Sequence, residues 1–330
     1  MKELIITAGS KIPESDQSVP ASNAFDVVVV SHGRNNSLIQ LIQSFCSEDT
    51  AIDMVGKFVV VVDSRPLPDI SGLCLGTRLT LIAPEKRVFI TSAKNMGWHE
   101  CTSDLILFVD DDNVVNGASL KHLVHIMNNN PSVGAVMPSV SYYHNKRMIW
   151  VYSPVLKPGK WRMSLIGRNT IEDAPPTTDL IEADALPNAF MVRRSVLEEI
   201  GGFDAEFRIN NSCDLCQRIK ARGYGTFAST RARFYHDVVV PGTLGYWAEH
   251  ATQDLERSLF ESRDWVILMR RLHPGIRFWN PVLSWHFMLW VSQVTIGLIL
   301  LGSGHRKILA NLLAYSRGFI LGWKDQDSGS

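Results

Sequence analysis

The chain lacks an excess of charge of either sign. Its 330 residues include 33 Lys and Arg and 33 Asp and Glu, so its formal net charge is zero. A dedicated nucleic-acid-binding protein normally shows a basic excess, and we therefore expect no nucleic-acid partner. Internal repeats and low-complexity tracts are also missing. With 45% hydrophobic and 20% charged residues, the composition predicts a globular chain of one large domain or two small ones.

The sequence also lacks a regular cysteine framework and an N-terminal apolar stretch. Its five cysteines are Cys46, Cys74, Cys101, Cys213 and Cys216. In a chain of this length their irregular spacing predicts reduced thiols in a cytosolic protein. The C-x-x-C spacing of the last two has no second pair nearby, which argues against a zinc or redox centre. We expect residues 1–24 to be a polar leader and not a signal peptide.

Short runs of β-branched residues alternate with helical patterns over the first 140 residues. Such runs suit strands that are buried on both faces of a parallel sheet. They lie at residues 26–30, 58–62, 105–109 and 133–137. Apolar residues at helical spacing lie at 38–45 and 118–128. The alternation predicts a doubly wound α/β domain, in which ligands bind at the carboxyl ends of the strands.

The middle of the chain gives weaker signals. Residues 141–185 are rich in Pro, Tyr, Trp and Arg and show no clear period. Beyond them we expect a strand at 190–192 and helices at 194–200 and 213–222.

The last third of the chain changes character. An Arg-rich helix is expected at 254–271, and residues 278–304 then contain no Asp, Glu, Lys or Arg. As a helix this run would be about 40 Å long, enough to cross a hydrocarbon core of about 30 Å. It can equally lie in the membrane interface beside an amphipathic helix at 306–323, or pack on the α/β core. We expect membrane contact.

Three consecutive carboxylates, Asp110, Asp111 and Asp112, end one predicted strand. Adjacent like charges raise one another's pKa, so such a cluster needs cations. A divalent metal with open positions for phosphate oxygens would meet that need. One Asp could instead cap the following helix, but three exceed that role. A phosphotransfer receiver or a phosphatase would also place carboxylates here.

Five motifs in register resemble the family 2 inverting glycosyltransferases of the GT-A fold. They are VVVVSHGRNNSLIQLIQSF, VVVVDSRP, KNMGWHECTSDLILFVDDDNVV, FMVRRSVLEEIGGFDAEFRINNSCDLCQRIKARGY and ARFYHD. The resemblance implies an α/β GT-A domain with a mixed central sheet over residues 25–245. Its nucleotide-binding half would be 25–140 and its acceptor half 141–245. A helical, membrane-associating region would follow at 246–330.

The same resemblance implies a donor site. Ser31 and Arg34 would line the nucleotide pocket, and Asp63 would accept a ring N–H of uracil, thymine or guanine. Lys94 and Asn95 would border the nucleotide.

The aspartate cluster matches the DXD motif of this family. Asp112, with Asp110, would hold Mn²⁺ or Mg²⁺ against the diphosphate, and Asp111 would reach the ribose. His236 lies where many relatives supply a further metal or diphosphate contact. A lone His at a strand end is more often a satisfied surface or core residue than a ligand, and only its place in the motif order makes the two roles comparable.

The sequence departs from the family where a general base is expected. The family pattern Glu-Asp-x-Asp-Leu-Cys-x-Arg is replaced here by residues 211–218, NSCDLCQR, so Asn211 and Ser212 stand in place of the acidic pair. The nearest remaining carboxylate, Asp214, is the candidate base, although it could equally cap its helix. Glu182 and Asp184 are further candidates.

The resemblance implies a metal-dependent hexosyltransferase at the cytoplasmic face of the cell membrane. A UDP-, GDP- or dTDP-sugar would be the donor, and a lipid-linked or cell-surface glycan the acceptor. Processive synthesis is disfavoured because no Q-x-x-R-W motif is present. The alternative function is a non-catalytic, sugar-nucleotide-binding or scaffold protein that has lost the base.

Overall fold

A computed structural model of the chain describes residues 24–47, 52–70, 72–156, 163–173, 176–240, 254–277 and 280–324. The expected leader, apart from residue 24, and the expected domain boundary at residue 245 lie outside the described residues. The strands are β1 (Phe25–Ser31), β2 (Val55–Val62), β3 (Leu79–Ile82), β4 (Leu105–Asp110), β5 (Asn113–Val114), β6 (Val133–Tyr142), β7 (Asn145–Val151), β8 (Ser153–Leu156), β9 (Met163–Ile166), β10 (Leu180–Glu182), β11 (Ala189–Arg193) and β12 (Gly225–His236). The helices are α1 (Asn35–Cys46), α2 (Ile90–His99), α3 (Gly117–Asn129), α4 (Arg194–Ile200), α5 (Asn211–Ala221), α7 (Leu255–Leu272), α8 (Pro281–Leu300) and α9 (His305–Lys324).

A mixed sheet in the order β10-β12-β6-β11-β4-β1-β2-β3 forms the centre of the molecule. Strands β4, β1, β2 and β3 run parallel, while β11 is antiparallel to both of its neighbours, β4 and β6. Every residue of β1 is buried, as its unbroken run of valines predicts for a strand that is covered on both faces. The mixed sheet expected from the sequence is confirmed.

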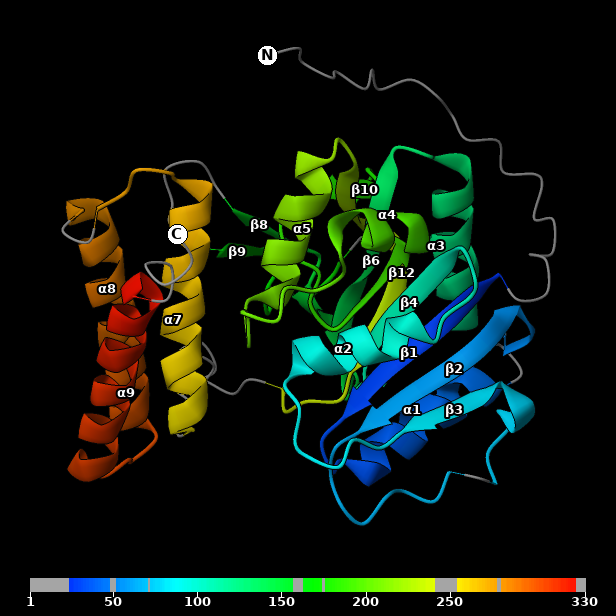
Figure 1. Cartoon of the computed structure of the whole chain (residues 1–330), viewed down its shortest axis with the longest axis horizontal. Helices are drawn as coiled ribbons and strands as arrows, with labels where there is room; N and C mark the ends of the chain where they lie inside the picture. Colours follow the sequence, from blue (N-terminus) through cyan, green and yellow to red (C-terminus); the bar gives the residue numbers. More distant parts are fainter. Residues whose placement is uncertain are drawn as a thin grey trace.

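Alternate residues of the central strands face two separate hydrophobic clusters, one on each side of the sheet. Val27 and Val29 of β1 pack with the apolar faces of α1 and α3. Val28, which points to the opposite side, packs with residues of α2, α4 and α5. The two-residue period of the strand thus places helices on both faces (Figure 1).

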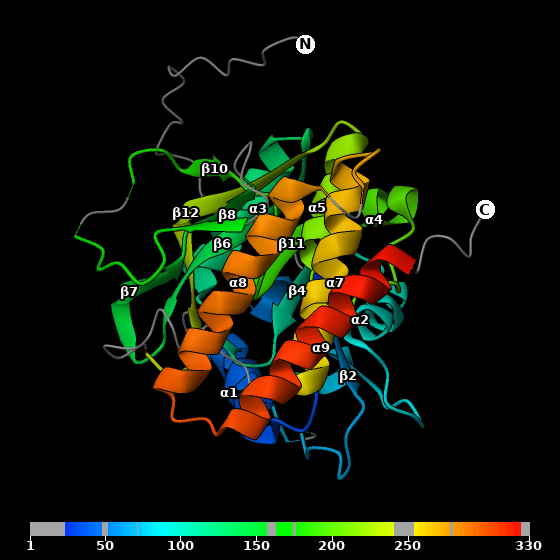
Figure 2. The ribbon, with the colours of Figure 1, turned by 90° about the vertical axis from the view of Figure 1, so that its left-hand side faces the viewer.

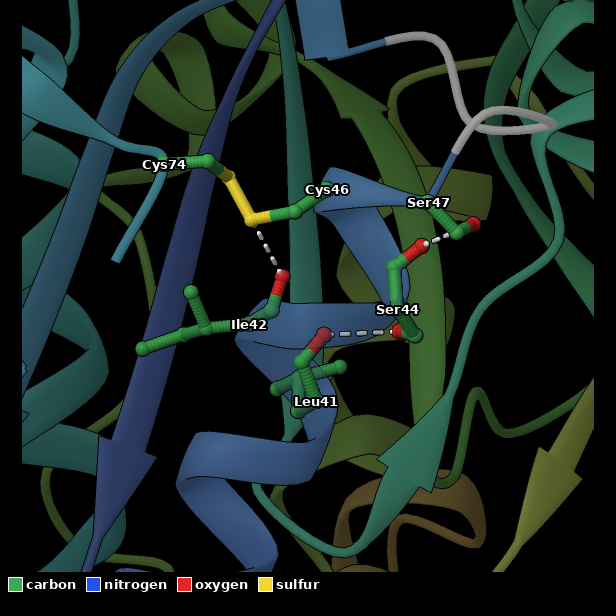
Figure 3. Close-up of a disulfide and its surroundings, with 6 residues drawn as sticks. All are labelled: Leu41, Ile42, Ser44, Cys46, Ser47 and Cys74. Atoms are coloured by element: carbon green, nitrogen blue, oxygen red, sulfur yellow. Dashed lines mark hydrogen bonds between the residues drawn. A yellow bond between two sulfur atoms is a disulfide. The ribbon is translucent and has the colours of Figure 1, made fainter. Parts of the chain in front are cut away.

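A disulfide joins Cys46, the last residue of α1, to Cys74 in the segment before β3 (Figure 3). The two Cα atoms lie 5.9 Å apart, although 28 positions separate the residues in the sequence. The expectation of five reduced thiols is therefore wrong for this pair, because the fold brings the end of a helix beside a loop. The remaining three, Cys101, Cys213 and Cys216, are free and buried.

Three long helices form a separate layer beside the sheet domain. Helix α7 packs along α9, and α8 lies against α9 (Figures 1 and 2). Residues 281–300 of the uncharged run form α8. Among the helices of the described residues, none is long and apolar enough to span a bilayer.

Candidate donor site

The polar residues that follow β1, β2 and β4 meet at one edge of the sheet. Strand β1 lies between β2 and β4, with Ser31 beside Val62 and Val30 beside Asp110. Parallel neighbours in register end at the same level, so their following loops share one edge. The expected convergence of residues 31–34, Asp63 and the aspartate cluster is thus present in the fold.

Arg34, just before α1, ties the aspartate cluster together. Its guanidinium bonds to Asp112, and its Nη2 lies 2.5 Å from Oδ1 of Asp111. Ser31 Oγ donates a hydrogen bond of 2.6 Å to the other oxygen of Asp111. Burial raises the pKa of Asp111 to about 6, although Ser31 and Arg34 act in the opposite direction. Burial also acts to raise the pKa of Asp112, but His236 and Arg34 outweigh it and lower that pKa.

Asp110 and the buried Lys94 lie side by side at the inner end of the cavity. Burial raises the pKa of Asp110, which the charge of Lys94 opposes. Burial lowers the pKa of Lys94, which the charge of Asp110 opposes. The Lys94 ammonium also lies 5.4 Å from the ring centre of Phe203. Lys94 and Asp110 both line the cavity described below.

His236 reaches the cluster from β12. Its neighbour in the sheet is Asn113 of β5, the residue directly after the cluster. This pairing brings His236 Nε2 to 3.3 Å from Oδ2 of Asp112. Within the part of the chain that the structure describes, no group of three or more His, Cys, Asp or Glu forms a complete metal centre.

The donor set of Asp112 and His236 nevertheless fits Mg²⁺ or Mn²⁺. Magnesium is commonly held by one or two carboxylates and completes its coordination with substrate phosphates and water. Manganese accepts the same carboxylate oxygens and also imidazole nitrogen. The two side chains could therefore contribute to such a site, with phosphate oxygens among the further ligands.

Asp63 follows β2 and is held in place by two contacts. Its Oδ1 lies 2.5 Å from Nδ1 of His32, and its Oδ2 accepts a hydrogen bond from the N–H of Val88 at 3.3 Å. The side chain of Asp63 is buried, whereas His32 and Val88 line the cavity.

The side chain of Asn95 makes three hydrogen bonds within the protein. Its Nδ2 donates to the carbonyl of Phe203, and its Oδ1 accepts from the N–H of Phe203 and from Nε1 of Trp98. These contacts tie α2 to the turn after α4. Asn95 is not among the residues that line the cavity.

A cavity of about 510 Å³ runs from Asp110 and Lys94 to the start of α7. Asn211 and Ser212, which replace the expected acidic pair, both line it. The two positions at which the sequence departs from the family pattern thus face the cavity, and both side chains there are neutral.

Asp214 occupies a different environment. Its side chain is 3% exposed, and its carboxylate accepts bonds from Arg218 Nε at 2.8 Å and Arg271 Nη1 at 2.7 Å. Both oxygens are therefore engaged by guanidinium groups. Asp214 is also not among the residues that line the cavity.

Several residues that the sequence does not assign to the site also line the cavity. Asn188 has the positive φ of 65° that Asn tolerates better than most residues, and its carbonyl accepts the N–H of Asp110. The far end of the cavity is lined by Asp254, Glu256 and Arg257 at the start of α7 and by Arg208, whose guanidinium lies 3.8 Å from the ring centre of Phe89. Arg208 lies within one of the motifs and the start of α7 within the expected Arg-rich helix, but only the fold brings these residues to one cavity.

The model of the glycosyl transferase family 2 matches residues 26–201, more than half of the chain. The chain belongs to glycosyl transferase family 2. The matched region includes the loops after β1, β2 and β4, so this glycosyltransferase carries its aspartate cluster within the family domain. The start of α7 lies outside the match.

Two solved structures share this GT-A fold. The crystal structure of GalNAc-T7 with UDP, GalNAc and Mn²⁺ has a TM-score of 0.52 at 13% identity and covers 66% of the chain. The chain spans only 43% of that protein. The mannosyltransferase PcManGT from Pyrobaculum calidifontis, in complex with GDP-Man and Mn²⁺, has a TM-score of 0.51 at 14% identity, covering 92% of this chain and 85% of its own. None of the curated proteins compared with the chain matches it.

Proposed function

We propose that the chain transfers a hexosyl group from a nucleoside-diphosphate sugar to a hydroxyl of a lipid-linked or cell-surface glycan, with inversion. The observation that carries this proposal is the convergence of Ser31, Arg34, Asp63 and the aspartate cluster at one sheet edge, beside a cavity. Both structural relatives were crystallised with a nucleotide or nucleotide sugar and Mn²⁺, which supports a nucleotide-sugar donor.

The donor would lie across the carboxyl edge of the strands. Asp63, with His32 beside it, would read the base, and Asp111 would reach the ribose. Arg34 and Lys94 are the cations of the cavity nearest the aspartates, so they would stabilise the negative charge of the diphosphate as it leaves.

Asp112, with Asp110 and His236, would hold Mn²⁺ or Mg²⁺. When bound, the ion supplies Lewis-acid stabilisation of charge on the departing diphosphate. Arg34 already bonds to Asp112, so the guanidinium has to share that carboxylate with the ion or move toward the phosphates.

We propose Glu256 as the general base in place of Asp214. Both oxygens of Asp214 are occupied by arginines, which disfavours proton transfer from an acceptor hydroxyl. Apart from Asp110, the carboxylates that line the described cavity are Asp254 and Glu256. Asp254 caps α7 by accepting the N–H groups of Glu256 and Arg257. The carboxylate of Glu256 contacts the exposed Arg87 at 3.3 Å, and the Glu256 side chain, which lines the cavity, is 48% exposed.

Calorimetry tests the donor proposal. We expect tight binding of one of UDP, GDP and dTDP in the presence of Mn²⁺, and weak binding without it. Asp112→Asn should remove the metal-dependent part of this binding. Equal binding by the Asp112→Asn variant would exclude Asp112 from the metal site.

The second candidate function is a non-catalytic nucleotide-sugar-binding protein or scaffold. It is favoured by one observation, the neutral pair Asn211 and Ser212 in the cavity wall. Metal-dependent nucleotide binding, with neither sugar transfer nor donor hydrolysis, would support it.

A further inference from the structure

Helices α8 and α9 form the outermost layer on one side of the molecule (Figure 2). Helix α9 is fixed to α7 by close packing: a Cβ on Gly318 would lie 2.0 Å from the carbonyl oxygen of Leu259. Ser258 Oγ donates to Asn311 Oδ1 at 2.6 Å, and Ser262 Oγ donates to the carbonyl of Tyr315 at 2.8 Å. One face of α9 is therefore packed against α7, and the opposite face of α9 points away from α7.

The outward faces of these two helices are apolar. Ten of the eighteen exposed large hydrophobic side chains of the described residues lie between positions 285 and 320. They are Trp285, Met288, Leu289, Ile296, Ile299, Leu300, Leu301, Leu309, Leu313 and Ile320. We call this set the outer apolar face. Trp285 is 64% and Leu313 is 62% exposed, so these large side chains stand largely in water, which marks an interaction site.

The same segment concentrates positive charge. Residues 281–324, which span α8 and α9, contain four Lys and Arg and no Asp or Glu, which leaves 29 basic and 33 acidic residues in the rest of a neutral chain. Arg306 and Arg317 are exposed and lie at helical spacing with Leu309, Leu313 and Ile320 on α9. Cations and apolar side chains thus share one face.

We propose that the outer apolar face lies in the interface of an anionic membrane, with α8 and α9 in the plane of the bilayer. A helix with apolar residues and flanking Lys or Arg binds such a surface through buried apolar area and attraction to anionic lipids. A second copy of the chain is a poorer occupant. A two-fold dimer places the same patch of both copies face to face. The cations of one copy would then face the cations of the other, and residues 281–324 supply no carboxylate to neutralise them.

This proposal names the surface through which the membrane contact expected from the sequence would occur. It rests on the proposed function only in so far as a lipid-linked acceptor would bring the chain to a membrane. It is tested without nucleotide or acceptor. A failure therefore leaves the calorimetric test of donor binding unaffected, and a failure of donor binding leaves this test unaffected.

The test is co-sedimentation of the full chain with vesicles of phosphatidylcholine alone or mixed with phosphatidylglycerol. The key variant is Leu309→Glu/Leu313→Glu. Its matched control is Leu67→Glu/Ile171→Glu, which places the same charge on two exposed apolar residues of the sheet domain, 38% and 46% exposed. Circular dichroism establishes that each variant is folded.

We expect binding to the mixed vesicles that weakens with salt. The Leu309→Glu/Leu313→Glu variant should bind about a hundredfold more weakly, because each Leu buried among acyl chains contributes roughly tenfold. The control should bind like the parent chain. Arg306→Gln/Arg317→Gln should weaken binding to the anionic vesicles only, since these cations interact with lipid charge.

Two outcomes would overturn the proposal. One is failure of the parent chain to bind the anionic vesicles. The other is a dimer, by light scattering, that Leu309→Glu/Leu313→Glu dissociates while vesicle binding persists, which would assign the outer apolar face to a second copy.

Discussion

Replacing Asp214 by Asn separates a structural role from a catalytic one. The carboxylate is almost fully buried and bridges Arg218 of its own helix, α5, to Arg271 of α7. If this bridge is structural, the Asn variant loses stability and keeps most of its activity. If Asp214 were the general base, the variant would be stable and inactive.

The expected loss of stability follows from the partners that remain. Removing one member of a buried ion pair typically costs about 3–5 kcal/mol, because the other charge is left uncompensated. Here Arg218 keeps the carbonyls of Ile200 and Gly202, and Arg271 keeps two carboxylates. Asn also retains one acceptor oxygen. We therefore expect the free energy of unfolding to fall by about 2–3 kcal/mol.

Urea denaturation and sugar transfer are measured on the same preparation. The midpoint should fall with little change in the m-value, and transfer should fall less than about tenfold at a temperature where the variant is folded. Loss of a general base costs about 10²- to 10⁴-fold in rate. Asp173→Asn is the control, since Asp173 is 90% exposed and pairs only loosely with Arg147 at 3.4 Å. Unchanged stability with transfer lowered a hundredfold would refute the structural role.

Three further predictions concern other parts of the structure. Glu256→Gln should lower transfer by about a hundredfold or more with nucleotide affinity unchanged. The control Arg87→Gln breaks the ion pair but keeps the carboxylate, so it should retain transfer. Equal activity of both variants would exclude Glu256 as the base. Asn95→Ala should lower the free energy of unfolding by about 2–4 kcal/mol, since three hydrogen bonds are lost, and calorimetry should find the same nucleotide affinity; a large loss of affinity would contradict this. Titration with a thiol reagent should find no rapidly reacting thiol in the native chain, because the three free cysteines are buried and burial raises the pKa of Cys101 and of Cys213 to about 12. It should find three thiols after unfolding and five after reduction, because one disulfide is present. Five thiols without a reductant would exclude the disulfide and favour the cytoplasmic location.

The central strands could be predicted because their signal is local. A strand buried on both faces must be apolar at every position, and the valine runs of β1 and β2 meet that condition. Strands β7 to β10 are short or partly exposed, so no period marks them. Helix α2 gives a weak signal for a similar reason, since Trp98 is the one large apolar residue among its buried residues, and the others are Thr91, Ala93, Lys94 and Gly97.

The donor end of the site could also be predicted, because the ends of parallel strands bring their loops together. That rule places Ser31, Asp63 and the aspartate cluster at one edge without any tertiary information. The role of Asp214 could not be deduced in this way. Its decisive partner, Arg271, lies 57 positions away on a different helix. The disulfide, too, depends on the approach of a helix end to a loop.

The two ends of the cavity come from different parts of the chain. The donor end lies within residues 26–201, the region that matches the family, while the far end includes the first turn of α7. Helix α7 also carries α9, so one rigid helix connects the cavity wall to the outer apolar face. An acceptor held in the membrane interface would then meet the cavity along α7. If the acceptor reaches the cavity in this way, Leu309→Glu/Leu313→Glu should lower transfer to a lipid-linked acceptor. Donor hydrolysis should be unchanged, because it needs no acceptor from the bilayer.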